Sequence, residues 1–504
     1  MTDLTLAAAR QQERAYGSLI SESDRPMFHL TPFCGWLNDP NGFSYYNNEY
    51  HLFYQYNPYN SRWDTMHWGH AVSSDLLRWK HLPAVLAPDS PLDEGGCYSG
   101  SAVTLPDGRQ LLMYTGLRRP IRSREIEEAE RTGEPFIQIQ NLAIGDGCDY
   151  VKYSKNPVID SDTLPPQARM THFRDPKILR CGDGTYLALI ANMKEDGLGQ
   201  VLMYRSRDCF TWKYWKPLIQ NDGRFGRMWE CPDFFELDGH WMFMVSPMDM
   251  KPAGLEFHNG CGSLLLTGSF DEKTGTFSPA FHQAIDYGID FYAAQTILTP
   301  DGRRVMTAWM NNWDTCLKRD ERVPWAGQMT IPRELSFRDG RLWQQPVREL
   351  EQYYTNIISY KKVPVSDEIS LYGVEGRTID LEVTVRPAPG EPLYRKFAIW
   401  FAMDQENHSA VRFNPDDGTV KIDRKHAGSR KAIVHQRRCL VPESMDGNIR
   451  LRIILDRNSF EVFINDGRYV MSATIPTPLS ADRISFRTEG KAVIDVTKRE
   501  IRIS

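Results

Sequence analysis

The unit that decides the fold first occurs as Trp36-Leu37-Asn38-Asp39-Pro40-Asn41-Gly42, followed by the turn pair Asn47-Asn48 and the run Tyr50-His51-Leu52-Phe53-Tyr54-Gln55-Tyr56. An apolar, aromatic-rich run behind an Asn or Gly turn pair is typical of a β-hairpin. Similar units recur four more times along the chain. Their motifs are Tyr98-Ser99-Gly100-Ser101, Phe173-Arg174-Asp175-Pro176, Trp229-Glu230-Cys231-Pro232-Asp233 and Ile289-Asp290-Phe291-Tyr292.

The spacing of these units predicts a radial repeat. With Asp39, Ser99, Asp175, Glu230 and Asp290 as markers, the intervals are 60, 76, 55 and 60 residues. Repetition of this kind is typical of a β-propeller, in which each repeat forms one four-stranded blade. We therefore predict an all-β fold with a five-bladed β-propeller over residues 27–345. The five markers are expected near the start of the innermost strands, where they face a common axial cavity.

The residues on either side of the repeats differ in character. Twelve of the 13 Trp and eight of the nine Cys lie at or before Trp343. Beyond it, runs at 379–385, 397–403, 449–455 and 460–465 alternate with turns, which predicts a C-terminal β-sandwich. The expected domains are an N-terminal helical extension (1–26), the propeller (27–345), and a linker plus β-sandwich (346–504), with a short linking helix at 348–354.

Charge and cysteine usage exclude several function classes. The 504 residues include 60 basic and 65 acidic side chains, a net charge of -5, which gives no basic footprint for nucleic acid or a membrane surface. The densest charge run, residues 118–134, contains five Arg and five Glu and is expected to be a solvated loop or short helix. The cysteines form no CxxC pair and no secretion signal is evident, so we expect a reduced, cytoplasmic setting.

The chain shows no pattern for a cofactor or a metal. It contains neither a Walker-type phosphate loop nor a GxSxG elbow. His67 and His70 stand three residues apart, but in a Trp-rich β region, where structural roles are expected. We expect no metal and no cofactor.

Three of the markers are carboxylates, which suggests glycoside hydrolysis. Asp39, Asp175 and Glu230 repel one another if they converge, and such sets persist where chemistry requires them. One carboxylate can attack or stabilise the anomeric carbon while another protonates the leaving oxygen. We expect Arg174 to favour ionisation of Asp175, and an apolar setting after Trp229 to raise the pKa of Glu230.

Residues around the carboxylates are candidates for binding a sugar. Hydrogen bonds to hydroxyl groups are expected from one polar set, with Arg174 beside it: Asn38, Gln55, Tyr98 and Ser99. Stacking on sugar rings is expected from the aromatic set Trp36, Trp63, Trp68 and Trp313. The segment 309–313 offers both Trp309 and Trp313 for this role.

Taken in order, these motifs resemble glycoside hydrolase family 32, the invertases, fructan hydrolases and sucrose-6-phosphate hydrolases. The resemblance covers nearly the whole chain and includes Phe53-Tyr54-Gln55-Tyr56-Asn57-Pro58, His67-Trp68-Gly69-His70 and Asp290-Phe291-Tyr292-Ala293-Ala294-Gln295 besides the motifs above. It implies a five-bladed propeller joined to a β-sandwich. By resemblance, Asp39 is the nucleophile, Glu230 the acid/base and Asp175 the stabiliser that holds two fructosyl hydroxyls. Tyr98 stands where many relatives carry Phe.

The implied activity is that of a retaining β-fructofuranosidase, which releases terminal fructose from sucrose or short fructo-oligosaccharides. Two alternatives stay open: a sucrose-6-phosphate hydrolase, and a non-catalytic carbohydrate-binding propeller that would not need three carboxylates. The phosphorylated substrate requires a cation near the glucosyl 6-position. Candidates for it are Arg62, Arg118, Arg119, Lys194 and Lys318. Some fructosyl transfer and any oligomeric state are compatible with these residues.

Overall fold

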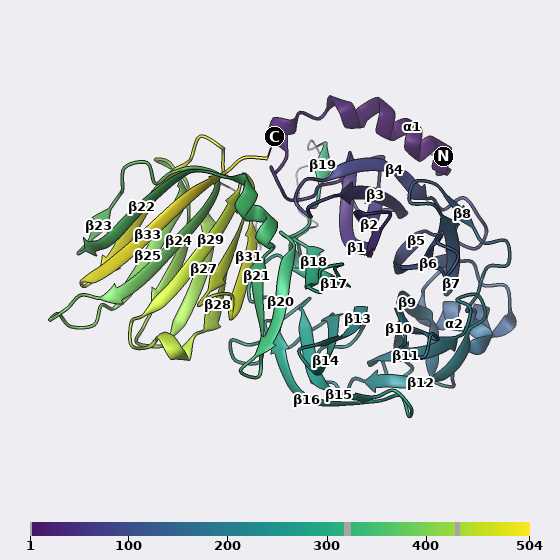
Figure 1. Ribbon diagram of the computed structural model, residues 1–504. Helices are drawn as coiled ribbons and strands as arrows, with labels where there is room; N and C mark the ends of the chain where they lie inside the picture. Colours follow the sequence, from purple (N-terminus) through teal and green to yellow (C-terminus); the bar gives the residue numbers. More distant parts are fainter. Residues whose placement is uncertain (1–2, 317–323, 429–433, 504) are drawn as a thin grey trace.

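The computed structural model describes residues 3–316, 324–428 and 434–503. Five antiparallel sheets are arranged around an axis, and a two-sheet sandwich packs against one side of the ring (Figure 1). The fold is thus the predicted propeller followed by a β-sandwich.

Each blade is a β-meander whose first strand lies innermost, next to the axis. The first blade contains β1 (Gly35–Tyr46), β2 (Glu49–Asn57), β3 (His67–Ser73) and β4 (Lys80–Leu86), and the second contains β5 (Cys97–Thr104), β6 (Gln110–Arg118), β7 (Ile137–Gly145) and β8 (Tyr150–Lys152). The third contains β9 (Ala168–Arg180), β10 (Tyr186–Lys194), β11 (Gly199–Ser206) and β12 (Lys213–Gln220), and the fourth contains β13 (Trp229–Leu237), β14 (His240–Pro247), β15 (Leu264–Asp271) and β16 (Thr276–Ala284). The fifth contains β17 (Tyr292–Leu298), β18 (Arg304–Trp309), β20 (Arg333–Arg338) and β21 (Arg341–Pro346).

The ring is closed by a segment that belongs to the last blade in sequence. After β18 and the short helix α3 (Trp313–Cys316), β19 (Trp325–Ala326) pairs in parallel with β1 of the first blade. Nearby, the Met329 N–H donates to the Leu30 carbonyl at 2.8 Å. The first and last blades are therefore joined by backbone hydrogen bonds.

Two helices lie outside the sheets. Helix α1 (Leu6–Tyr16) begins at Thr5, whose hydroxyl accepts the Ala8 N–H, and it packs on the outer strand β4 through an Arg10 hydrogen bond to the Ala84 carbonyl at 2.9 Å. Helix α2 (Ser123–Thr132) lies between β6 and β7 and carries part of the Arg- and Glu-rich run. None of the helices in the described ranges is long and apolar enough to cross a membrane.

The C-terminal domain consists of two six-stranded sheets, reached through a 3-10 helix at Arg348–Tyr353. One sheet comprises β22 (Tyr354–Val365), β33 (Ala492–Ile501), β24 (Thr378–Pro387), β29 (Ile449–Asp456), β30 (Ser459–Ile464) and β31 (Tyr469–Thr474). The other comprises β23 (Glu368–Ile369), β32 (Arg483–Glu489), β25 (Lys396–Met403), β26 (His408–Asn414), β27 (Thr419–His426) and β28 (Gln436–Leu440).

Buried charged side chains cross the interface between the two domains. Arg333 of the propeller contacts Glu461 of the sandwich and lies 3.0 Å from Asp286, and all three side chains are fully buried. His29 bridges Asp456 at 2.8 Å and Glu461 at 3.0 Å. Asp456 also accepts the backbone N–H groups of Met27, Phe28 and His29. These hydrogen bonds attach the segment before β1 to the sandwich.

Candidate active site

The innermost strand of every blade contains one extra residue at its motif. The register shifts fall between Leu37 and Pro40, Tyr98 and Gly100, Arg174 and Lys177, Glu230 and Asp233, and Tyr292 and Gln295. Such β-bulges bend a strand, increase its twist and redirect side chains next to it. Each carboxylate therefore sits at a place where the regular alternation of faces along its strand is broken.

The three carboxylates occupy different places in their bulges. Counted from the last residue paired before the bulge, Glu230 is that residue itself, Asp175 follows it by one position and Asp39 by two. Asp175 adopts a left-handed backbone with φ of 63°, which is uncommon outside glycine. Three different local geometries thus direct three acids towards one space.

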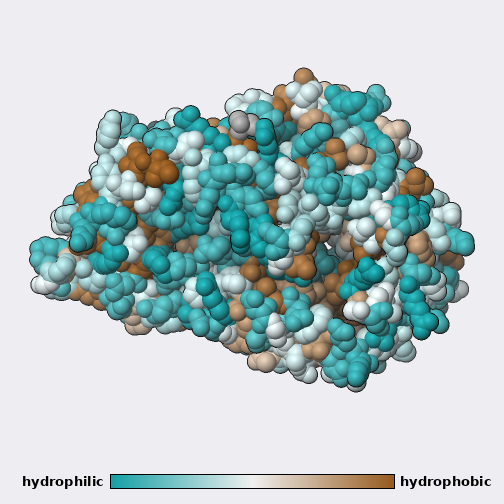
Figure 2. Space-filling view, viewed as in Figure 1, coloured by the Kyte–Doolittle hydropathy of each residue, from teal (hydrophilic) through white to brown (hydrophobic). Residues whose placement is uncertain are grey.

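That space is a cavity of about 290 Å³ formed by the inner strands and the loops beside them. Figure 2 shows a mostly hydrophilic surface on the face seen in Figure 1, with a recess over the middle of the propeller. Ten of the twelve predicted site residues line the cavity: Asn38, Asp39, Gln55, Trp63, Tyr98, Ser99, Arg174, Asp175, Glu230 and Trp313.

The other two predicted residues, Trp36 and Trp68, are buried behind the cavity, so the expectation that they stack on a sugar is wrong. Trp36 is 2% exposed and its indole N–H donates to Asn38 Oδ1 at 2.8 Å. Trp68 is completely buried and donates to the Tyr98 carbonyl at 3.0 Å. Each ring orients a residue that does line the cavity.

Trp313, rather than Trp309, lies at the cavity. Trp309 is fully buried, and its ring packs edge-on against Trp313 with centroids 4.9 Å apart. Trp63 is 44% exposed and also packs edge-on against Trp313, at 6.3 Å. The two rings at the cavity therefore support each other, with Trp309 behind them.

Asp39 is held by short-range hydrogen bonds. Its Oδ2 accepts from the Ser99 hydroxyl at 2.7 Å, and its Oδ1 accepts from the Asn38 amide at 3.0 Å. Burial, together with the nearby negative charge of Glu230, raises the pKa of Asp39 above its ordinary value. Two uncharged donors thus fix the orientation of Asp39.

Asp175 is hydrogen-bonded to the strand that carries Glu230. The backbone N–H of Cys231 donates to Asp175 Oδ2 at 3.0 Å. Burial raises the pKa of Asp175 to about 7; Arg174 opposes this rise, and Glu230 and Asp39 add to it. Among the hydrogen bonds of the described residues, none uses Asp175 Oδ1, so this oxygen is available to a sugar hydroxyl.

Glu230, not Asp175, is the main partner of Arg174. The guanidinium donates to Glu230 Oε1 from Nε at 3.0 Å and from Nη2 at 2.8 Å, whereas its Nε lies 3.9 Å from Asp175 Oδ2. The Tyr292 hydroxyl donates to Glu230 Oε2 at 2.6 Å. The apolar surroundings expected for Glu230 are therefore wrong, because Trp229 turns away and donates to the Phe225 carbonyl at 2.8 Å.

The fifth marker, Asp290, does not face the cavity, so the expectation that all five markers face it is wrong. It is completely buried and forms an ion pair with Arg424 of the sandwich at 2.5 Å. It also accepts from the backbone N–H and the hydroxyl of Thr474, at 2.7 and 2.8 Å. In the last blade the motif residue serves the domain interface, because the sandwich covers that side of the ring.

Further lining residues belong to no motif that the sequence singled out: Glu134, Gln138, His172 and Met248. Glu134 and Gln138 follow α2, which is fixed by buried charges rather than being only solvated. Glu125 pairs with Arg118 at 2.5 Å, and Glu128 accepts the Thr171 N–H at 2.9 Å. The Arg- and Glu-rich run is the only sequence signal near these residues. Which of its acidic residues are buried can be seen only once their partners are known.

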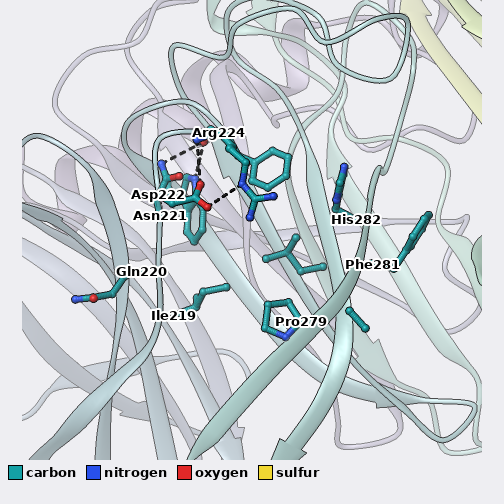
Figure 3. A pocket seen from close by; sticks show the side chains of 12 residues that line it. Ile219, Gln220, Asn221, Asp222, Arg224, Pro279, Phe281 and His282 are labelled. Atoms are coloured by element: carbon teal, nitrogen blue, oxygen red, sulfur yellow. Dashed lines mark hydrogen bonds and ion pairs between the residues drawn. The ribbon is translucent and has the colours of Figure 1, made fainter.

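Three further cavities among the described residues contain none of the three acids Asp39, Asp175 and Glu230. The one in Figure 3, about 340 Å³, lies between the outer strands β12 and β16. Its carboxylate, Asp222, is paired with Arg224 at 2.8 Å, and Gln220 extends away from Pro279 (Figure 3). Within the described part of the chain, no group of three or more His, Cys, Asp or Glu side chains is placed to hold a metal ion. His67 contacts backbone carbonyls, and His70 contacts His51 at 3.0 Å.

Comparison with known proteins gives matches over nearly the whole chain. Residues 29–346 match the model of the glycosyl hydrolases family 32 N-terminal domain, and residues 346–502 match the family 32 C-terminal model. The chain is 34% identical to raffinose invertase of Escherichia coli, over 93% of both chains. It is 32% identical to a sucrose-6-phosphate hydrolase of Zymomonas mobilis, over 98% of this chain and 95% of the other. A Bombyx mori β-fructofuranosidase mutant solved with sucrose superposes with a TM-score of 0.82 at 30% identity, covering 98% of each chain.

Proposed function

The chain belongs to glycosyl hydrolases family 32 and is a fructofuranosidase, and from this premise we propose that it hydrolyses sucrose and short fructo-oligosaccharides from the fructosyl end with retention of configuration. The observation that carries the proposal is the convergence of the three acids around one residue, Cys231. Cys231 directly follows Glu230, its N–H donates to Asp175, and its thiol lies 3.5 Å from Asp39 Oδ2.

In the first step Asp39 attacks the fructosyl anomeric carbon while Glu230 gives a proton to the leaving oxygen. In the second step Glu230 takes a proton from water while the water oxygen attacks the anomeric carbon, which breaks the bond to the Asp39 carboxylate and releases fructose. Hydrogen bonds from Ser99 and Asn38 hold the Asp39 carboxylate in one orientation for attack. The Arg174 guanidinium and the Tyr292 hydroxyl hold the Glu230 carboxyl in one orientation through hydrogen bonds to its two oxygens.

Asp175 is assigned to the sugar rather than to proton transfer. Its Oδ2 accepts the Cys231 N–H, and its Oδ1 is left to accept hydrogen bonds from fructosyl hydroxyls. Gln55 is partly engaged within the protein, since its Nε2 donates to the Cys97 carbonyl at 3.0 Å, which leaves its oxygen and its second N–H for a sugar. We further propose that residues 27–345 carry the chemistry and that residues 346–504 are structural.

We propose that the preferred sugars are unphosphorylated. Of the described residues that line the cavity, Arg174 is the one Arg or Lys, and it is paired with Glu230. His172 is neutral, because burial and Arg174 lower its pKa to about 3. Glu134 adds a carboxylate that repels a phosphate.

The cations considered for a phosphate lie elsewhere or have partners. Arg118 is buried against Glu125, Arg119 lies 3.3 Å from Glu94, and Lys194 lies 2.7 Å from Asp196. Arg62 is not among the residues that line the cavity, and Lys318 lies outside the described residues. A reduced, cytoplasmic setting completes the proposal, and it is supported by the eight free cysteines of the described side chains.

The test is kcat/KM for sucrose, sucrose 6-phosphate and 1-kestose on one preparation, with the anomer of the first fructose released followed by NMR. We expect β-fructofuranose first and sucrose or 1-kestose above sucrose 6-phosphate. α-Fructofuranose as first product overturns the retaining mechanism. A preference of about tenfold for sucrose 6-phosphate, worth about 1.4 kcal/mol, overturns the substrate assignment.

A further inference from the structure

Beneath the catalytic carboxylates, three consecutive inner strands carry polar side chains at the same register position. Lys177 on β9, Asp233 on β13 and Gln295 on β17 are each the first residue paired after the bulge of their strand. In the first two blades this position holds Pro40 and Gly100. The polar set is therefore confined to the blades that carry Asp175 and Glu230 and to the blade after them.

These three side chains are buried and bonded to one another. Lys177 Nζ lies 3.2 Å from Asp233 Oδ2 and donates to Gln295 Oε1 at 3.0 Å. Asp233 Oδ2 also accepts the backbone N–H of Thr296 at 2.6 Å. Lys177 is 9% exposed, Gln295 6% and Asp233 0%. One lysine thus joins three blades at the axis.

The position of this cluster makes it relevant to the chemistry. Inner strands of neighbouring blades belong to different sheets, so no backbone ladder fixes β9 against β13. Asp175 lies two residues before Lys177, and Glu230 lies three residues before Asp233. The Lys177–Asp233 pair therefore joins the strand of Asp175, which is assigned to the sugar, to the strand of Glu230, which is assigned to proton transfer.

A stabilising role alone is a weak explanation for this pair. A buried ion pair adds little net stability compared with apolar residues of similar volume, because removing both charges from water is costly. The geometric requirement of catalysis is stricter, since a misplacement of about 1 Å can cost about 10²-fold in rate.

We propose that Lys177 and Asp233 are positioning residues for the hydrolysis, which hold Glu230 in register with the bound fructosyl group. The inference rests on the proposed function. If the wild-type protein does not cleave sucrose, the proposed function fails. If the wild-type protein is active, the variants test the positioning role separately.

The experiment compares two substrates in each variant. Sucrose needs a proton from Glu230 to release glucose, whereas an aryl β-fructofuranoside with an acidic phenol departs with little protonation. We expect Lys177→Met to lower kcat/KM for sucrose about 100-fold and for the aryl fructoside less than about 10-fold. A fall in the amount of folded enzyme lowers both equally, so the ratio reports position alone.

Two further variants and a control keep the test decisive. Lys177→Met/Asp233→Asn removes both charges, and we expect it to fold while keeping the altered ratio; Lys177→Arg should restore the ratio in part. Lys216→Met is the matched control, because Lys216 joins the same two blades at their outer edge through Thr276 Oγ1 at 3.1 Å. A wild-type substrate ratio in both Lys177→Met and the double variant overturns the inference, as does the same shift in Lys216→Met.

Discussion

Two clusters of buried charged groups, one in the cavity and one between the domains, are satisfied to different degrees. At the interface, Glu461 accepts from His29, from Arg333 and from the Ile331 N–H, and Asp456 accepts three backbone N–H groups. In the cavity, Asp175 and Glu230 share the guanidinium of Arg174, whereas Asp39 accepts hydrogen bonds from the uncharged Ser99 and Asn38 side chains.

Glu461 at the interface differs from Asp39 and Asp175 in how its surroundings change its pKa, whereas burial raises the pKa of the interface residue Asp286 as it does in the cavity. Coulombic attraction to Arg333 and hydrogen bonds outweigh burial at Glu461, so its pKa is lowered. Burial and mutual repulsion dominate at Asp39 and Asp175, whose pKa values are raised. A fully bonded carboxylate is inert and stabilises the fold, whereas an under-bonded one stays ready to react. Substitutions in the cavity are therefore expected to change activity, and substitutions at the interface are expected to change stability.

The largest effect is expected for Asp39→Asn. The amide cannot attack the anomeric carbon, so kcat should fall by more than the ~10²–10⁴-fold typical of losing a general acid, on every substrate. Thermal unfolding should stay close to wild type, because Ser99 and Asn38 can still bond to the amide. Steady-state kinetics and a melting curve on the same sample measure both. Near wild-type turnover of folded Asp39→Asn would remove it from the mechanism.

Glu230→Gln should lose about 10²–10⁴-fold on sucrose and recover in part on an aryl fructoside, because that leaving group needs little protonation. The matched change Glu256→Gln, at a carboxylate that bonds the Tyr287 hydroxyl at 2.9 Å away from the cavity, should leave kcat unchanged. Equal losses on both substrates for Glu230→Gln would contradict the acid role.

The opposite pattern is expected at the interface. Glu461→Gln leaves the buried Arg333 and His29 without a carboxylate they share, and breaking a buried ion pair costs about 3–5 kcal/mol. Activity per folded molecule should be retained. Glu443→Gln, at the partly exposed pair with Arg468, serves as control and should cost less than about 1 kcal/mol in denaturant unfolding. An unstable control would show that the comparison fails.

A smaller effect concerns pH. Burial opposes the charge on His29, but hydrogen bonds to Asp456 and Glu461 outweigh it and raise the pKa of His29 to about 9. A raised pKa gives stability that is complete below the unfolded value of about 6.5 and is lost as pH rises through 9. The melting temperature should therefore fall between pH 7.5 and 9.5, and His29→Gln should flatten that slope. An identical slope in the variant counts against the assignment.

The smallest expected effect is on specificity. Glu134→Gln removes a negative charge from the exposed rim of the cavity, so the ratio of kcat/KM for sucrose 6-phosphate to that for sucrose should rise a few-fold. The rise should shrink in added salt. Glu127→Gln, at an exposed residue of the preceding helix α2 that does not line the cavity, should leave the ratio unchanged.

The sequence indicates the strand that carries each acid better than it indicates where a side chain points. Asp39 and Asp290 occupy similar motifs, yet Asp290 pairs with Arg424, a residue 134 positions later that no local pattern could identify. Trp36 and Trp68 belong to the motifs of the site, but their rings pack behind it. A Trp in such a motif is equally compatible with burial in the core and with stacking on a sugar. Only the geometry of the bulges decides between these two positions.

The residues that the sequence missed share a different cause. Glu134 reaches the cavity because α2 is held to the propeller by Glu125 and Glu128, two acids buried inside a run that reads as solvated. A charged residue is buried only with its partners, and one of these comes from another blade: Thr171, which bonds Glu128, lies on β9. Rim residues are set by insertions, and insertions follow no repeat.

The hydrogen bonds that attach His29 to Asp456 join residues 427 positions apart. The strand that carries Asp39 begins a few residues after His29, and it also pairs with β19, about 290 positions later. Contacts between such distant parts of a chain form late and slowly during folding. During synthesis, most of the polypeptide must therefore leave the ribosome before Asp39 reaches its final place. The onset of activity in a timed translation reaction should then report completion of the sandwich rather than of the blade that contains Asp39.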